Sequence, residues 1–218
     1  MLLLALDRPQ RPVRWLRSFA EMARCSYSPE GDWQGDGWGV AWLGAEGRWH
    51  SRHSLAPLWQ EEASFVSLPE SRRWVCHARS ASFPATRGVV AYNQPYLLGS
   101  TAFVFNGLLA GVRTPAPVPG RIGAQKIAHL VAENLEHRSL SRTLDWLQEY
   151  LNAHSRGVPA LNIGLCDGEE LAVFSQYEKH PGYYNLRVAQ GDGYCAIASQ
   201  PLAGWSFSPL KAGIVHRF

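Results

Sequence analysis

The sequence has 218 residues, of which 46% are hydrophobic and 11% aromatic, so it can bury a large core. Its net charge of +3 is spread along the chain, and the longest basic run is Arg72-Arg73, which argues against nucleic-acid binding. The apolar run at residues 2–6 is too short for a signal peptide or a membrane helix, so we expect a cytoplasmic protein with no membrane contact.

The four cysteines are far apart along the chain and form no C-x-x-C pair. In a cytoplasmic chain of this size we expect reduced thiols, each packed as a small buried hydrophobe. No zinc, haem, P-loop or dinucleotide-binding pattern occurs, so the sequence predicts no metal ion and no cofactor. The cysteines are Cys25, Cys76, Cys166 and Cys195.

In chain order, the first half combines short strands with one helix. A strand at residues 2–6 is followed by apolar residues at helical spacing, which predict a helix at residues 12–23. A loop rich in Gly and Asp covers residues 28–37. Further short runs of aromatic and β-branched residues predict strands at 38–43, 48–53, 74–78, 88–92 and 101–105.

Two helices with one-sided apolar stripes follow, the first around residues 127–135 and the second around 140–151. This order differs from the regular alternation of a doubly wound sheet. It predicts an α+β domain with antiparallel or mixed sheets and helices outside, and no linker divides residues 1–218. The chain then ends in strands predicted at 160–166, 171–176, 183–189, 194–199 and 213–216.

A glycine-rich segment, residues 35–39, leads into a strand rather than a helix. It therefore does not offer a phosphate group the helix N-terminus that phosphate-binding loops provide. We interpret it as a tight turn in which the backbone at Gly37 approaches another group closely.

Arg79 lies at the end of a predicted buried strand and is followed by Ser80. A guanidinium at this place can hold a carboxylate through two parallel, charge-assisted hydrogen bonds. A structural ion pair at the strand end is the alternative, and the local sequence leaves both open.

Residues 103–107 predict an apolar strand that ends in Asn106-Gly107. A side-chain amide and the following backbone N–H can together stabilise an oxyanion. An ordinary Asn-Gly turn is the alternative at this point.

Together these segments resemble the class II glutamine amidotransferases, which belong to the N-terminal-nucleophile hydrolases, over nearly the whole chain. Residues 35–42 are similar to G-D-G-W-G-I-A-[WY], residues 77–82 to H-x-R-x-[AS]-[ST], and residues 103–107 to F-x-H-N-G. Gln94-Pro95-Tyr96 is similar to [HQ]-P-F. Residues 183–186 and 197–202 resemble the closing strands of the stand-alone, ergothioneine-type members.

The resemblance implies a four-layer αββα sandwich of two mostly antiparallel sheets. In that family an N-terminal cysteine attacks the side-chain amide of glutamine, and its own α-amine acts as the base. By similarity Arg79 would hold the α-carboxylate of a glutamine or γ-glutamyl substrate, in a pocket with His77, Ser80 and Gly37. Asn106 and the N–H of Gly107 would stabilise the oxyanion, and a partner synthase subunit would receive the ammonia.

The sequence departs from the family at two functional positions. Aligned without a gap, Met1 falls where the family has its cysteine, and a thioether does not form the thioester. The acidic element T-D-S-E before the first long helix reads Ile-Gly-Ala-Gln at residues 122–125, so the carboxylate expected to hold a substrate ammonium is replaced. Phe105 stands where the family has histidine.

Two functions follow from these departures. The chain is an amidotransferase or amide hydrolase whose cysteine lies ahead of Met1, encoded upstream of the chosen start. Alternatively it is a non-catalytic relative that keeps the fold and a carboxylate-binding pocket as a binding or regulatory module. A third idea, Cys25 as the nucleophile, requires cleavage after Arg24, which would delete the first strand.

Overall fold

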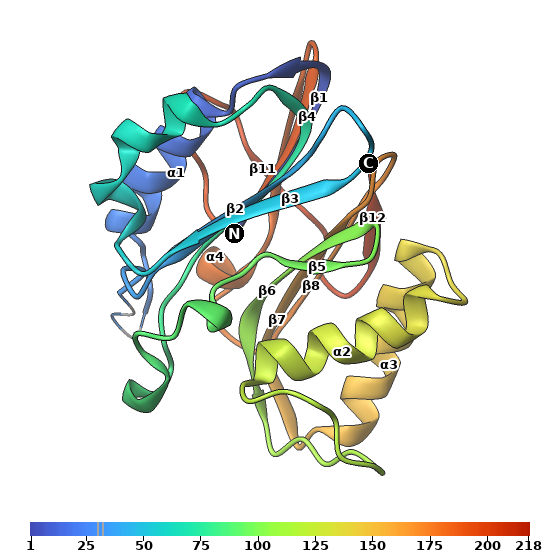
Figure 1. Ribbon diagram of the computed structural model, residues 1–218. Coiled ribbons are helices and arrows are strands. Elements are labelled where there is room, and N and C mark those ends of the chain that lie inside the picture. The colour runs from blue at the N-terminus through green and yellow to red at the C-terminus, as the bar shows by residue number, and fades with distance from the viewer. Residues whose placement is uncertain (30, 32) are drawn as a thin grey trace.

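In the computed structural model, the described residues are 1–29, 31 and 33–218. Glu30 and Asp32, which fall in the predicted loop at residues 28–37, lie outside them. The described chain forms two sheets with helices on their outer faces (Figure 1). The strand orders are β11-β9-β10-β1-β4-β2-β3 and β12-β8-β7-β6-β5, and the paired strands run antiparallel.

The bounds of the elements are as follows. The first sheet contains β1 (Leu2–Gln10), β2 (Trp38–Leu43), β3 (Trp49–Ser54), β4 (Ser71–Ala78), β9 (Arg187–Gly191), β10 (Tyr194–Ala198) and β11 (Ser208–Pro209). The second contains β5 (Tyr96–Leu98), β6 (Thr101–Ala110), β7 (Gly157–Cys166), β8 (Leu171–Tyr177) and β12 (Val215–Arg217). The α-helices are α1 (Val13–Arg24), α2 (Gly123–Leu135), α3 (Leu140–His154) and the short α4 (Pro181–Tyr184).

Three buried clusters separate four layers of structure. The first lies between the seven-stranded sheet and α1, the second between the two sheets, and the third between the five-stranded sheet and α2 with α3. Successive side chains of a strand point to opposite faces, so neighbouring residues of β1 and of β6 enter different layers. The predicted αββα sandwich is therefore confirmed. Representative pairs, in the same order, are Leu4 with Phe19, Leu3 with Val104, and Phe103 with Leu144.

Two predicted strands are wrong. Residues 88–92 contain a 3-10 turn at Val90–Tyr92, and the first part of 183–189 belongs to α4, so that the strand begins only at β9. Both segments are rich in the aromatic and β-branched residues typical of strands. Gly88 (φ 70°) and His180 (φ 54°) have left-handed backbone conformations, which interrupt an extended chain in front of each segment.

All four cysteines are free, as predicted. Cys76 and Cys166 are buried, whereas Cys25 is exposed and Cys195 is half-buried, so the prediction of buried small hydrophobes is wrong for Cys25. No helix of the described residues combines the length and the apolar character that a membrane span requires.

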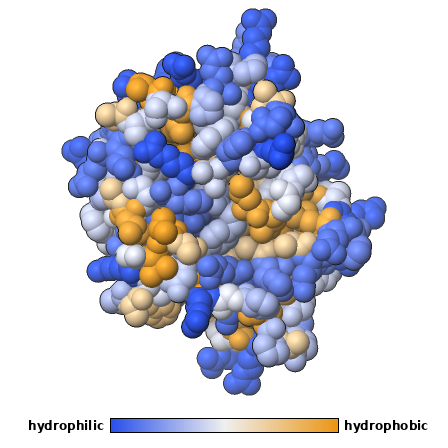
Figure 2. All heavy atoms as spheres, in the orientation of Figure 1, coloured by the Kyte–Doolittle hydropathy of each residue, from blue (hydrophilic) through white to orange (hydrophobic). Residues whose placement is uncertain are grey.

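Polar residues cover most of the face shown in Figure 2, with hydrophobic patches between them. Some large hydrophobic side chains are exposed in the segment that follows Arg79, including Phe83, Val89 and Val90.

The two sheets approach closely where Leu3 of β1 packs over Gly164 of β7. A Cβ atom at position 164 would lie 2.7 Å from both Leu3 Cδ atoms, and Leu3 is fully buried. The glycine therefore sets how closely β1 packs on the second sheet, and β1 carries Met1 at its end.

We expect Gly164→Ala to lower the free energy of unfolding by about 1–3 kcal/mol, because the added methyl overpacks the layer between the sheets. Gly168→Ala is the matched control, since its Cβ would make only an ordinary contact, 3.5 Å from Leu43 Cδ2. Chemical denaturation of both variants measures the difference. Equal stabilities would contradict a close packing of β1 at Gly164.

Candidate active site

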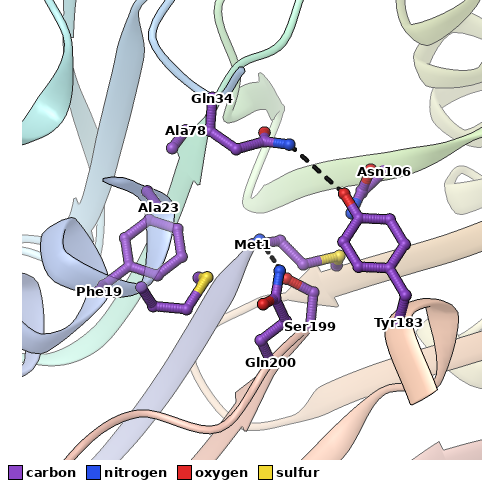
Figure 3. A pocket seen from close by; sticks show the side chains of 10 residues that line it. Met1, Phe19, Ala23, Gln34, Ala78, Asn106, Tyr183, Ser199 and Gln200 are labelled. Atoms are coloured by element: carbon purple, nitrogen blue, oxygen red, sulfur yellow. Dashed lines mark hydrogen bonds between the residues drawn. The ribbon is translucent and has the colours of Figure 1, made fainter. Parts of the chain in front are cut away.

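A small pocket lies at the amino end of β1, between the ends of the two sheets (Figure 3). Its cavity volume is about 10 Å³, the space of about one water molecule. The Met1 side chain is 3% exposed and occupies the middle of the site. The other lining residues are Phe19, Met22 and Ala23 of α1, with Gln34, Ala78, Asn106, Tyr183, Ser199 and Gln200.

Residues 199 and 200, which follow β10, hold the amino end of β1 in place. The Met1 amine donates a hydrogen bond to Ser199 Oγ (3.0 Å), and the Ser199 N–H donates to the Met1 carbonyl (3.1 Å). Burial lowers the pKa of this amine to about 5. Gln200 accepts from the Tyr27 N–H and donates to Ser26 Oγ, which ties the end of α1 to the same pocket.

Asn106 points into the layer between the sheets, because it lies two residues after Val104, which packs in that layer. It lines the pocket together with Met1. The strand does not end at Asn106-Gly107, as the sequence predicted, but continues to Ala110. The interpretation of these two residues as an ordinary turn is therefore wrong.

The N–H of Gly107 points to the side of β6 that pairs with β5, at a place past the end of β5. Gln94 occupies the preceding part of that edge, because its side chain accepts from the Phe105 N–H (2.6 Å) and donates to the Phe105 carbonyl (2.9 Å). Backbone N–H groups of residues two apart point to the same side of a strand, so the Gly107 N–H points there too. A side chain is excluded at position 107, since a Cβ would lie 2.3 Å from the Ala160 carbonyl oxygen.

Arg79 directly follows β4 and its last residue, the pocket residue Ala78, and is 6% exposed. Its Nη2 donates to the carbonyl and to Oγ1 of Thr86 (2.9 and 3.1 Å), and its guanidinium carbon lies 5.7 Å from the centre of the Tyr92 ring. Its Nη1 is buried and has no hydrogen-bond partner. Within the described residues no carboxylate forms a salt bridge with Arg79. Asp36 is near enough for its charge to act on Arg79, but its own contacts are to Arg87 (3.3 Å) and to the Ala81 N–H (2.8 Å).

Gly37 makes a backbone hydrogen bond at this end of β4. Its carbonyl accepts from the Arg79 N–H (2.8 Å), and its φ of 114° is open mainly to glycine. A Cβ there would lie 2.3 Å from Asn93 Nδ2, so the predicted close backbone approach is to Asn93. Neither Gly37 nor Ser80, which is half-buried, lines the pocket.

His77 is 7% exposed, and its Nδ1 is buried without a hydrogen-bond partner. Burial lowers its pKa well below the ordinary value of 6.5; the Met1 amine, when it is protonated, and the charge of Arg79 lower it further. The Met1 amine and the Arg79 guanidinium therefore both lie near His77. The structure places Asn106 with Met1 in the pocket and His77 with Arg79 next to it.

No protein-family model and no curated protein sequence matches the chain. Solved structures do match it. A glutamine aminotransferase class-II domain protein from Silicibacter pomeroyi aligns with a TM-score of 0.59 and 18% identity, covering 83% of this chain and 86% of that one. A predicted glutamine amidotransferase from Pseudomonas aeruginosa aligns with a TM-score of 0.52 and 16% identity, covering 100% and 96%.

The glutamine phosphoribosylpyrophosphate amidotransferase of B. subtilis aligns with a TM-score of 0.66 and 12% identity. It covers 98% of this chain, which spans only 46% of that enzyme. The chain has the fold of a class II glutamine amidotransferase domain. At these identities the likeness establishes the fold, and the chemistry depends on the residues of this pocket.

Sequence reasoning missed several residues that line the pocket of this amidotransferase fold. Gln34 and Tyr183 carry no local pattern that indicates a site, and Tyr183 lay in a predicted strand. Ser199 and Gln200 belong to a segment that was interpreted only as a closing strand. The described residues contain no group of three or more His, Cys, Asp or Glu side chains that could hold a metal ion.

The depressed pKa of His77 predicts a pH-dependent stability. Because the folded pKa lies below 6.5, the unfolded chain binds more protons than the folded one below that pH, so the free energy of unfolding falls as the pH drops below about 6.5. We expect His77→Gln to flatten this fall, measured by denaturation between pH 5 and pH 8. His137→Gln, at an exposed side chain, is the control and should leave the slope unchanged.

Proposed function

We propose that this protein binds glutamine or a γ-glutamyl amide in its class II amidotransferase pocket, and that it hydrolyses the amide when a thiol stands at the amino end of β1. The observation that carries the proposal is the joint placement of Met1 and Asn106 in one pocket, with the buried residue Arg79 directly following the pocket residue Ala78 in the chain. The assignment of roles to Arg79, His77, Ser80, Gly37, Asn106 and Gly107 is part of this proposal.

The carboxylate end of the ligand pairs with Arg79. A buried guanidinium whose Nη1 has no partner is costly, and a carboxylate is the group that best relieves that cost. Neutral His77 adds no competing charge. In this proposal Ser80 and the backbone at Gly37, which lie next to Arg79 at the end of β4, contact the same part of the ligand.

The amide end points toward Asn106 and the position of Met1. The Asn106 side chain and the Gly107 N–H are the donors for the amide carbonyl oxygen, which becomes the oxyanion of the tetrahedral intermediate. A ligand displaces the Met1 side chain, which is flexible, because the cavity beside it holds only about one water molecule.

Hydrolysis needs a thiol that Met1 does not provide. A cysteine here would lose its proton to an α-amine, attack the amide carbon and release ammonia, and water would then cleave the thioester. A lowered amine pKa, as at Met1, leaves the amine neutral and able to act as the base. The thiol would come from residues ahead of Met1 in a longer chain, and the upstream codons test this directly.

A binding module is the second candidate. It is favoured because the Met1 thioether fills the amide position, and because Gln125, in the segment where the family is acidic, is engaged elsewhere. Its side chain accepts from the Arg121 N–H and donates to the Ala91 carbonyl. Glutamate bound at Arg79 without turnover would support this candidate.

The extent of the domain, its cellular location and its partner are part of the same proposal. We treat residues 1–218 as one domain of a cytoplasmic protein. The B. subtilis enzyme is about twice as long as its aligned part, so a synthase partner, as a subunit or a further domain, is the candidate receiver of ammonia.

We expect Arg79→Ala to weaken the binding of glutamine and of glutamate about 10- to 100-fold, because a charged hydrogen-bonded pair contributes about 1.5–3 kcal/mol. Arg87→Ala is the matched control, since Arg87 lies in the same segment but is exposed and pairs with Asp36. Isothermal titration calorimetry measures both. Unchanged binding after Arg79→Ala would remove the carboxylate role.

We expect Met1→Cys, with an added initiator methionine removed, to release ammonia from glutamine. Met1→Ala is the control that opens the pocket without a thiol. Adding Asn106→Ala to Met1→Cys should lower the rate by about 10²–10³, since one oxyanion donor is lost. A Met1→Cys protein that folds and binds glutamine but releases no more ammonia than Met1→Ala would contradict the hydrolytic reading.

A further inference from the structure

The segment that leads into α1 and forms it carries a concentration of positive charge. Residues 8–24 contain five arginines and one acidic residue, so the segment has a net charge of +4. The whole chain has a net charge of +3, and the other residues therefore sum to −1. All five arginines are exposed, namely Arg8, Arg11, Arg14, Arg17 and Arg24.

The helix brings three of these arginines onto one face, although no two of the five are adjacent in the sequence. Successive residues of an α-helix turn by about 100°, so Arg14, Arg17 and Arg24 lie within an arc of about 80° and span about 15 Å of the axis. The opposite side of α1, which includes Phe19 and Ala23, is buried against the seven-stranded sheet (Figure 1). The arginines therefore form the outer face of the helix.

The stability of α1 does not explain this pattern. Its first turn has no acidic residue, and Pro12 at the N-cap makes no side-chain cap bond. Arg11 and Arg14 lie at the positive end of the helix dipole, where acidic residues are favourable and basic ones are not. Among the described residues, none of the five arginines forms a salt bridge. The described part of the chain therefore supplies no carboxylate to them.

Aromatic rings hold Arg14 in place at this face. Its guanidinium carbon lies over the Trp205 ring, 4.6 Å from the ring centre, and Trp205 in turn stacks on the buried Trp15 at 3.7 Å. A guanidinium over a ring can still use the N–H groups at its edge to bind a carboxylate. Arg14 is thus ordered before any partner binds.

We propose that the outer face of α1 binds an acidic segment of a partner protein through Arg14, Arg17 and Arg24. Guanidinium groups bind carboxylates through two parallel, charge-assisted hydrogen bonds, which makes arginine well suited to this contact. The inference goes beyond the proposed function, and neither depends on the other. The other side of α1 contributes Phe19 and Met22 to the pocket, so a partner bound here is separated from the pocket by one helix.

The composition of this face favours a protein over other anionic partners. Glu21 lies on the same face, between Arg17 and Arg24 along the helix. A nucleic acid, with a phosphate on every unit, would bring negative charge against Glu21, whereas a protein segment can place a neutral or basic residue there. A membrane surface is disfavoured, because no large hydrophobic side chain of residues 8–24 is exposed to enter it.

The test measures the binding of a labelled peptide of alternating Glu and Ser to the full chain by fluorescence anisotropy. We expect Arg14→Glu combined with Arg17→Glu to weaken binding at least about tenfold, and the affinity of the unmodified chain to fall as salt is added. Arg121→Glu combined with Arg142→Glu is the matched control, because both arginines are exposed near α2 and α3, and it should change the affinity less than about twofold.

The folding of the variants is checked by circular dichroism. Glutamate near the start of a helix is favourable, so the double variant of α1 should fold. Arg17→Glu alone keeps Arg14 over Trp205 and is the milder variant, for which we expect about threefold weaker binding.

Each other outcome overturns the inference. The unmodified chain may bind the peptide no more tightly than the double variant of α1, in which case this face has no role in binding. An equal loss in the control pair shows that only the net charge attracts the peptide. Single-stranded DNA of the same charge, or vesicles that contain phosphatidylserine, may bind to α1 more tightly than the peptide, and the partner is then of another class. None of these results affects the proposed function.

Discussion

The site depends on one geometric constraint, the alternation of side chains on two strands that face each other between the sheets. On β1 the inward residues are Met1 and Leu3, and on β6 they are Val104 and Asn106. Leu3 packs toward the five-stranded sheet and Val104 toward the seven-stranded sheet. These contacts fix how β1 and β6 face each other. The polar residue of one strand therefore meets the end of the other, and a shift of either strand by one residue would turn Asn106 away from Met1.

The interior changes from apolar to polar at this end of the sandwich. Away from the site the layer between the sheets is hydrophobic, whereas near Met1 it contains His77, Asn106, Asn162 and Ser175. Asn162 and Ser175 satisfy each other and the Tyr184 carbonyl, so they stabilise the frame. His77 Nδ1 has no such partner. Asn162 and Ser175 therefore form part of the scaffold, whereas His77 keeps an unpaired nitrogen in the same layer.

Much of the fold followed from sequence periodicity, because long apolar patterns such as those of α2 and α3 report burial directly. The motif residues Ala78 and Asn106 line one pocket with Met1, and the roles of Arg79 and Asn106 stay predictions. The predictions that are wrong concern short segments. Val90–Tyr92 and α4 look like strands by composition, but left-handed residues ahead of them and contacts distant in sequence decide their shape. Gln34 and Tyr183 could not be predicted, since they meet only after both sheets have formed.

The free-energy cost of Arg79 and Asn106 is consistent with the proposed ligand, whatever residue stands at the amino end of β1. Arg79 keeps a buried Nη1 without a partner, and within the described residues no carboxylate pairs with it. Replacing such a charge with apolar residues often leaves a fold equally stable or makes it more stable. Asn106 likewise presents an amide to the pocket where Ala102 and Val104 earlier on the strand are apolar. A fold that needed only stability would not require either group, whereas a carboxylate and an amide on one small molecule would satisfy both.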